Sequence, residues 1–338
     1  MHLAEVIRLR TVPQAGLLLA LTQRCPLSCA HCSTDSSPTA PQHSAAPLRR
    51  LVSTFTAAAH PELIFMSGGE PLLRPDLVAE LATAARTVGT RSMLLSGMFF
   101  ARRSMPAAVR RAVSTLDHFS ASIDVFHERE VARSDALRAL AAVADLVPSV
   151  SLHVTSSDEA YLTDVLTQVR RMFGDRVPVL VARVRPTGRA RSFVADPADV
   201  VDPGPCEFAN WPLVDFDGTV YACSRQNLVR RHRPGHLVLG HAARDSWSAL
   251  SAAIQARPTL RSVRSLGAIE TARRAGAASC DGVCQTCVGL PGDVAVPEPV
   301  EQVSRQLLGS LRPRQLARRW GAGEHSDLVE LGWVPCAG

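Results

Sequence analysis

The stretch Cys25-Pro26-Leu27-Ser28-Cys29-Ala30-His31-Cys32 brings three cysteines together with the spacing C-x3-C-x2-C. Three thiolates on one short loop can hold three corners of a four-iron cluster, which leaves the fourth iron without a protein ligand. A zinc site usually has four closed ligands and C-x2-C spacings, so zinc fits this loop less well. The loop therefore predicts an iron–sulfur cluster with one open iron, where a cofactor can bind.

Composition limits the classes of function that are open to this chain of 338 residues. All 37 basic residues are arginine, which excludes a pyridoxal phosphate Schiff base because that linkage needs a lysine. The arginines are scattered and form no basic–aromatic stripe, so there is no case for nucleic-acid binding. No apolar run approaches the ~20 residues that cross a bilayer. Nine cysteines, largely grouped and without a targeting segment, predict metal ligation in a reducing cytoplasm.

Apolar runs of strand length alternate with helical stretches in the first half of the chain. The expected strands lie at 17–22, 63–66, 92–95, 119–123, 150–154 and 177–184. The expected helices lie at 48–59, 76–88, 106–116, 128–147 and 159–173. Continuous apolar runs are typical of buried parallel strands, and repeated β–α units imply right-handed crossovers. Six units predict an α/β fold with a partial (β/α)6 barrel, whose chemistry lies at the carboxyl ends of the strands.

The rest of the sequence is expected to form shorter regions around this core barrel. The predicted divisions are an N-terminal extension at 1–14, the barrel at 15–190, a linker at 191–204, a small cysteine-rich domain at 205–290 and a helical C-terminal segment at 291–338. The linker is marked by Asp-Pro and Pro-Gly pairs, which favour turns and loops. In the last segment the helical pattern runs from Val300 to Trp320, and Pro313 would interrupt it.

A second motif follows the second expected strand, where Ser67-Gly68-Gly69-Glu70-Pro71 stands. Paired glycines let backbone approach a ligand closely, and a glutamate offers a charged acceptor for an ammonium group. With the cysteine loop, this stretch resembles the radical S-adenosylmethionine (SAM) superfamily and its GGEP motif. The resemblance implies that Gly68, Gly69 and Glu70 contact the amino group of SAM, and that Cys25, Cys29 and Cys32 hold a [4Fe-4S] cluster.

Further residues match positions of the same superfamily. In these enzymes one electron from the cluster breaks the S–C5′ bond of SAM, giving methionine and a 5′-deoxyadenosyl radical that abstracts hydrogen from the substrate. His31 stands where relatives usually place an aromatic residue near the adenine. Ser122 and Asp124 end the fourth strand, share one face, and resemble an S-x-D motif that faces the ribose or substrate. Arg183 or Arg185, at the end of the sixth strand, is expected to reach the SAM carboxylate.

The cysteines of residues 205–290 resemble those of the SPASM/twitch domains that carry auxiliary clusters in radical SAM enzymes. Cys206 and Cys223 flank an expected hairpin whose Asp217-Gly218 pair favours a tight turn. Because one cluster needs four ligands, the resemblance favours a single auxiliary [4Fe-4S] cluster on Cys206, Cys223, Cys284 and Cys287. The pattern departs from a full SPASM domain, which has more closely spaced cysteines.

Two cysteines are left over, Cys280 and Cys336. Cys280 is an alternative cluster ligand or a free thiol. Cys336 is a late cluster ligand, a spare residue at the end of the chain, or a thiol that returns hydrogen to a substrate radical. Both are therefore candidate catalytic thiols.

The resemblance implies an enzyme that abstracts a hydrogen atom, and it leaves the substrate open. Modification of a peptide is slightly favoured, with a flavodoxin or ferredoxin as electron donor. A separate leader-peptide-binding protein would serve such a substrate, because few residues precede Cys25. The alternatives are a dehydrogenase or epimerase of a sugar or aminocyclitol, and a non-enzymatic iron–sulfur protein of electron transfer. Neither a nucleic acid nor a membrane is expected as a partner.

Overall fold

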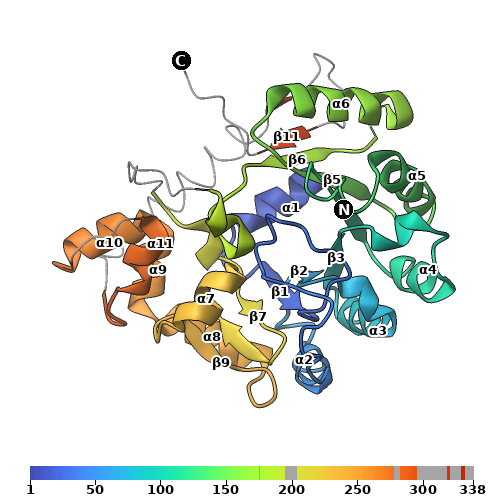
Figure 1. Cartoon of the computed structure of the whole chain (residues 1–338). Helices are drawn as coiled ribbons and strands as arrows, with labels where there is room; N and C mark the ends of the chain where they lie inside the picture. Colours follow the sequence, from blue (N-terminus) through green and yellow to red (C-terminus); the bar gives the residue numbers. More distant parts are fainter. Residues whose placement is uncertain (175, 195–203, 278–281, 295–317, 320–328, 332–338) are drawn as a thin grey trace.

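The computed structural model of the chain places most of the sequence, and its arrangement is drawn in Figure 1. The residues that the structure describes are 1–174, 176–194, 204–277, 282–294, 318–319 and 329–331.

Six parallel strands form the centre of the molecule. They are β1 (Gly16–Ala20), β2 (Leu63–Ser67), β3 (Arg91–Ser96), β4 (His118–Ile123), β5 (Val150–Thr155) and β6 (Val179–Ala182). Each strand pairs in parallel with the next one along the chain. This confirms the predicted α/β fold with a parallel sheet. The barrel is not closed, because β1 has β7 as its other neighbour and β6 has β11.

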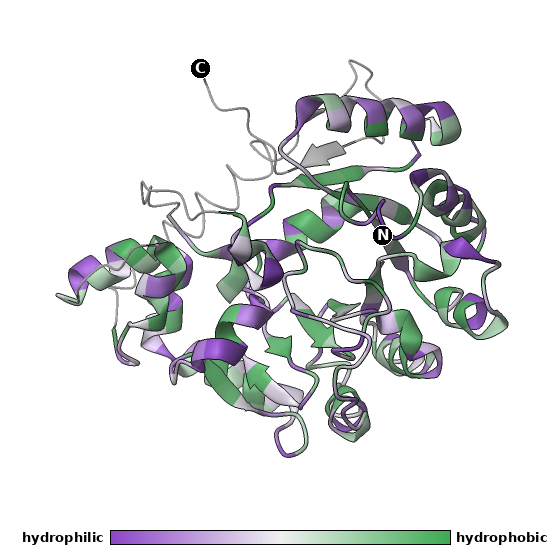
Figure 2. Ribbon diagram, in the orientation of Figure 1, coloured by the Kyte–Doolittle hydropathy of each residue, from purple (hydrophilic) through white to green (hydrophobic). Residues whose placement is uncertain are grey.

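The crossover helices lie on the outside of this sheet (Figure 1). They are α2 (Ala46–Val52), α3 (Pro75–Arg86), α4 (Ala107–Val113), α5 (Arg133–Ala144) and α6 (Glu159–Phe173). The bounds of α6 agree with the prediction, and its buried residues recur at helical spacing. Figure 2 shows hydrophilic and hydrophobic residues alternating along this helix. No helix among the described residues is long and apolar enough to cross a membrane.

Two of the predicted helices have the wrong bounds, in each case because of a turn. Helix α2 ends at Val52, since Thr56 and Ala59 exchange backbone hydrogen bonds in a tight turn. Helix α5 begins only at Arg133, because the carboxylate of Asp124 accepts hydrogen bonds from the backbone of Phe126 and His127 and holds the chain in a turn there.

The N-terminal extension contains a helix that the sequence pattern did not predict, α1 (Leu3–Arg10). The indole Nε1 of Trp211 donates to the carbonyl oxygen of Leu9 over 3.0 Å. Glu5 forms an ion pair with Arg91 at the start of β3, and the carbonyl oxygen of Met1 lies 3.0 Å from Nδ1 of His118 at the start of β4. Helix α1 therefore packs near the amino ends of the strands, away from their carboxyl ends.

The sheet continues beyond β1 into the cysteine-rich region. The added strands are β7 (Leu213–Val214), β8 (Thr219–Tyr221) and β9 (Val238–His241). β7 and β8 pair antiparallel across Asp217 and Gly218, which confirms the predicted hairpin. β7 also pairs in parallel with β1, so this region is joined to the core by a shared sheet. Its helices are α7 (Gln226–His232), α8 (Trp247–Ala256), α9 (Pro258–Leu266), α10 (Ala268–Arg274) and α11 (Val283–Val288).

Two short strands extend the sheet at its other edge, next to β6. β10 (Arg318–Arg319) pairs antiparallel with β11 (Val329–Leu331), and β11 pairs in parallel with β6. The helix expected over Val300–Trp320 is therefore wrong at Arg318 and Arg319, whose backbone belongs to a strand pair. The rest of that expected helix lies outside the described residues.

Gly16 allows the close contact between β1 and Trp211. A Cβ atom at Gly16 would stand 2.3 Å from the indole ring, which is itself fixed by its bond to Leu9. We expect Gly16→Ala to lower the unfolding free energy by about 1–3 kcal/mol, the usual cost of overpacking. Chemical denaturation followed by circular dichroism measures this change. The matched control is Gly292→Ala, where an added Cβ has no neighbour within 4 Å. Equal stability of the two variants would contradict the expected clash.

Candidate functional site

The cysteine loop follows β1 directly, and other segments hold it by hydrogen bonds to its backbone carbonyl oxygens. The amides of Gly69 and Glu70 donate to the carbonyl oxygens of Thr22 and Arg24, over 2.7 and 2.8 Å. Gly68 has a φ of +124°, and a Cβ at Gly69 would stand 2.2 Å from the Arg24 oxygen. The glycine pair is therefore required where the end of β2 crosses the start of the cysteine loop.

Arg189 holds the other side of the loop. Its Nε and Nη2 atoms donate to the carbonyl oxygen of Cys29 over 2.9 and 2.8 Å, and its Nη1 donates to that of Ser36 over 2.6 Å. The preceding Gly188 has a φ of +57°, and a Cβ there would stand 2.1 Å from the Cys32 oxygen. The sequence alone does not reveal the role of Arg189, although its place shortly after the sixth strand is a signal for one.

The three thiols of the loop lie close enough to interact. The charges of Cys29 and Cys32 act on Cys25, and burial raises the pKa of Cys25 to about 12. The Sγ atom of Cys32 lies 3.4 Å from the Thr34 hydroxyl. A buried thiol becomes a thiolate when a cation compensates its charge, so this donor set fits iron.

Glu70 is buried and bonded to the protein itself. Its carboxylate accepts hydrogen bonds from the backbone amides of Leu72 (3.0 Å) and Gly97 (2.9 Å) and from the Ser96 hydroxyl. Burial outweighs these bonds and raises the pKa of Glu70 to about 7. The carboxylate thus ties the end of β2 to the end of β3. Its contact with SAM remains a prediction.

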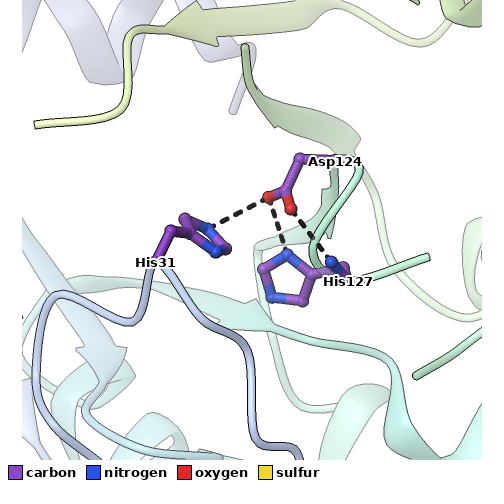
Figure 3. Close-up of side chains that lie close together, drawn as sticks. All are labelled: His31, Asp124 and His127. Carbon is purple, nitrogen blue, oxygen red and sulfur yellow. Dashed lines mark hydrogen bonds and ion pairs between the residues drawn. The ribbon is translucent and has the colours of Figure 1, made fainter. Parts of the chain in front are cut away.

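Asp124 gathers two histidines beside the cysteine loop (Figure 3). Its Oδ2 atom lies 2.7 Å from Nδ1 of His127 and 3.2 Å from Nε2 of His31. The ring of His31 also stacks on Phe126, with centroids 4.5 Å apart. Nδ1 of His31 is buried and has no hydrogen-bond partner among the described residues, which suits a group that meets a bound molecule. The structure therefore brings together His31 and Asp124, two residues that are predicted to contact the cofactor.

The protonation of this group follows from burial and from its hydrogen bonds. Burial disfavours the charged carboxylate, but hydrogen bonds from His127 and His31 outweigh burial and lower the pKa of Asp124. Burial likewise disfavours a charged His127, and its bonds to Asp124 and Cys29 outweigh that effect and raise the pKa of His127. A protonated His127 thus faces Cys29. From the sequence alone, His127 is only a candidate acid–base group just after the fourth strand.

Two further predicted cofactor residues are Ser122 and Arg185. Ser122 is half-buried within β4, opposite His153 of β5. Arg185 lies over the ring of Phe208, with 5.6 Å from its guanidinium carbon to the ring centroid. Phe208 belongs to the cysteine-rich region, so Arg185 faces the second group of cysteines. Its contact with SAM remains a prediction.

The structure brings together the four cysteines expected to bind an auxiliary cluster. Cys206 precedes a short 3-10 helix, Cys223 follows β8, and Cys284 and Cys287 share one face of α11. Their charges act on one another, and burial raises the pKa of Cys287 to about 12 and that of Cys206 and Cys223 as well. Nε2 of His236, which the sequence analysis did not single out, lies 3.9 Å from the Cys287 sulfur. The two candidate catalytic thiols, Cys280 and Cys336, lie outside the described residues.

The chain is similar to a known protein family and to several known proteins. Residues 19–162 match the family described as Radical SAM superfamily. The PqqA peptide cyclase of Gluconobacter oxydans (strain 621H) is 34% identical over 188 residues, covering 54% of this chain and 49% of that protein. The PqqA peptide cyclase of Rhizobium meliloti (strain 1021) is 34% identical over 117 residues, covering 34% of this chain and 30% of that protein. The chain thus spans about half or less of the length of these relatives.

Among solved structures, the chain aligns with that of Streptococcus suis SuiB bound to the precursor peptide SuiA. It aligns with a TM-score of 0.47 and 8% sequence identity, covering 66% of this chain and 62% of that chain.

Arg189 should control how well the cysteine loop accepts iron. Arg189→Ala removes three donors from the carbonyl oxygens of Cys29 and Ser36, so we expect the loop to lose order and about four irons per chain, one whole cluster. Iron and sulfide analysis after anaerobic reconstitution measures the loss, and Arg189→Lys should restore part of it. Arg171→Ala, an exposed change on α6, is the control. Full iron content in Arg189→Ala would show that the loop does not depend on this clamp.

Glu70 should make stability depend on pH. Because its folded pKa of about 7 lies above the ordinary value of 4.5, folding takes up a proton between these values, and stability is lost as the pH rises through that window. Glu70→Gln removes this slope, which is at most about 1.4 kcal/mol per pH unit. Urea unfolding of the unloaded protein from about pH 4.5 to about pH 7 measures it, with exposed Glu62→Gln as the control. Parallel curves for wild type and Glu70→Gln would contradict the expected proton uptake.

Proposed function

Residues 19–162 of this chain form a radical SAM superfamily domain, and from that premise we propose that the chain reductively cleaves SAM and abstracts a hydrogen atom from a peptide. The observation that carries the proposal is the placement of three interacting thiols on a loop at the carboxyl end of β1. In a sheet of parallel β–α units this edge is where active sites form.

Each part of the site has a task in this proposal. Cys25, Cys29 and Cys32 hold the [4Fe-4S] cluster that the family implies. When bound, the cluster and SAM supply one electron and the 5′-deoxyadenosyl radical. Asp124 orients His31 and His127, and it keeps a protonated His127 directed at Cys29. The stacked His31 and Phe126 rings provide a flat aromatic surface beside the loop.

The second group of cysteines supports an oxidative outcome. Cys206, Cys223, Cys284 and Cys287 form a four-thiol set that suits an auxiliary [4Fe-4S] cluster. Removal of a hydrogen atom leaves a substrate radical, and formation of a new bond then releases one proton and one electron. The auxiliary cluster would accept that electron. A flavodoxin or ferredoxin would supply the electron for SAM cleavage.

A peptide is the proposed substrate because the relatives that match this chain are named peptide cyclases. The matched segments cover half or less of those proteins. A peptide substrate is therefore our proposal for this chain, and it rests on the similarity of these segments. A separate protein that binds the leader of the peptide is part of the same proposal.

SAM cleavage tests the proposed function directly. We expect the anaerobically reconstituted protein to convert SAM to 5′-deoxyadenosine and methionine when dithionite is added, as measured by liquid chromatography and mass spectrometry. The Cys25/Cys29/Cys32→Ala variant should form none, because it lacks the ligands of the SAM-binding cluster. It should keep about four irons on the second set of cysteines.

The reciprocal variant provides the control. Cys206/Cys223/Cys284/Cys287→Ala should lose about four irons and still form 5′-deoxyadenosine. SAM cleavage that survives in the Cys25/Cys29/Cys32→Ala variant would disprove the assignment of the loop. If the wild-type protein has its full iron content and does not cleave SAM, the alternative of a non-enzymatic iron–sulfur electron-transfer protein is favoured.

A further inference from the structure

Two arginines share one aromatic ring between the two groups of cysteines. The guanidinium carbon of Arg225 lies 4.6 Å from the centroid of Phe208, and that of Arg185 lies 5.6 Å from it. Stacking on an aromatic ring holds a guanidinium in a fixed orientation and leaves its N–H edge available for other partners.

The protein compensates these two positive charges only in part. No salt bridge joins either guanidinium to a carboxylate within the described part of the chain. Partial desolvation lowers the pKa of Arg185, and the nearby charge of Arg225 lowers it further. The charges of Cys284, Glu207 and Cys206 oppose this effect, but the pKa of Arg185 remains lowered. Two like charges held close together favour the binding of an anion.

A buried donor points to the same conclusion. The Nε atom of Arg225 is buried and has no hydrogen-bond partner within the described part of the chain. A buried N–H without an acceptor is unfavourable, and a ligand oxygen would remove that cost. Arg185 is exposed, so its guanidinium remains accessible to a ligand from solvent.

The arginine pair lies close to the proposed site of chemistry. Arg185 follows β6, and a few residues later the backbone amide of Arg189 donates to the Cys32 oxygen over 3.0 Å. On the other side, the amide of Ser224, beside Arg225, donates to the Phe208 oxygen over 2.9 Å. Figure 1 shows the chain after β6 running between the core sheet and helices α9–α11. The pair thus lies beside the second group of cysteines, on a segment that reaches the cysteine loop at Arg189.

We propose that Arg185 and Arg225 form a carboxylate-binding site that orients an acidic side chain of the peptide substrate. Arginine matches a carboxylate with paired N–H donors, and charge-assisted bonds of this kind fix orientation as well as affinity. This inference rests on the proposed function, since it names the substrate as an acidic peptide. It also replaces the expectation that Arg185 binds the carboxylate of SAM.

Binding of two capped amino acids tests the site. The probes are N-acetyl-glutamate methylamide and N-acetyl-glutamine methylamide, which differ only in the side-chain carboxylate. They are titrated into the anaerobically reconstituted protein saturated with SAM, and binding is followed by saturation-transfer NMR. We expect the glutamate probe to bind at least about tenfold more tightly than the glutamine probe, a difference of about 1.4 kcal/mol.

The variants assign that preference to the two arginines. Arg185→Gln and Arg225→Gln should each reduce binding of the glutamate probe to the level of the glutamine probe. Arg231→Gln, an exposed change on α7, should leave the preference intact. Iron analysis accompanies each variant, and if Arg225→Gln loses iron, Arg185→Gln alone decides the result.

Three outcomes would overturn the inference. The wild-type protein could bind the two probes alike, or Arg185→Gln could keep the full preference. Alternatively, Arg185→Gln could weaken SAM binding in equilibrium dialysis while the SAM-saturated variant still prefers the glutamate probe, which would assign this guanidinium to the SAM carboxylate. None of these results affects the proposed function, because SAM cleavage by the wild-type protein is measured separately.

Discussion

The hydrogen bonds to the carbonyl oxygens of the cysteine loop are the constraint on which the rest of the site depends. The loop is irregular, so its backbone groups need partners from elsewhere. Gly69 and Glu70 supply amides to one side, and Arg189 supplies a guanidinium to the other. These partners come from β2 and from the chain after β6, so the loop has its shape only once the sheet has formed.

The carboxylate of Asp124 has a similar organising role on the neighbouring strand. It is almost wholly buried, at 1% exposure, and a buried charge is tolerated only with several partners. The backbone amides of Phe126 and His127 and both histidine rings supply them. The same turn that ends β4 therefore delays the start of α5 and fixes His31 and His127 beside the thiols.

Strand β1 links the two groups of cysteines. The first group follows β1 directly, and β7, which leads to Cys223 through the hairpin, pairs with β1 in parallel. A hydrogen bond from Asn227 on α7 to Asp35 provides a second link between the cysteine-rich region and the chain beyond the first loop. Because of these links, Arg185 after β6 meets Phe208 of the cysteine-rich region.

The sequence by itself determined the parallel α/β core, the hairpin at Gly218 and the grouping of Cys25, Cys29 and Cys32, because apolar runs, turn residues and close spacing are local signals. It could not determine the roles of Arg189, His127 or His236. It also could not determine that the Arg185 side chain packs on Phe208. Each of these side chains meets a partner far along the chain or across a turn. Only the packing of the sheet decided which partner that is, since a side chain's neighbours depend on strand order and register, which are long-range properties.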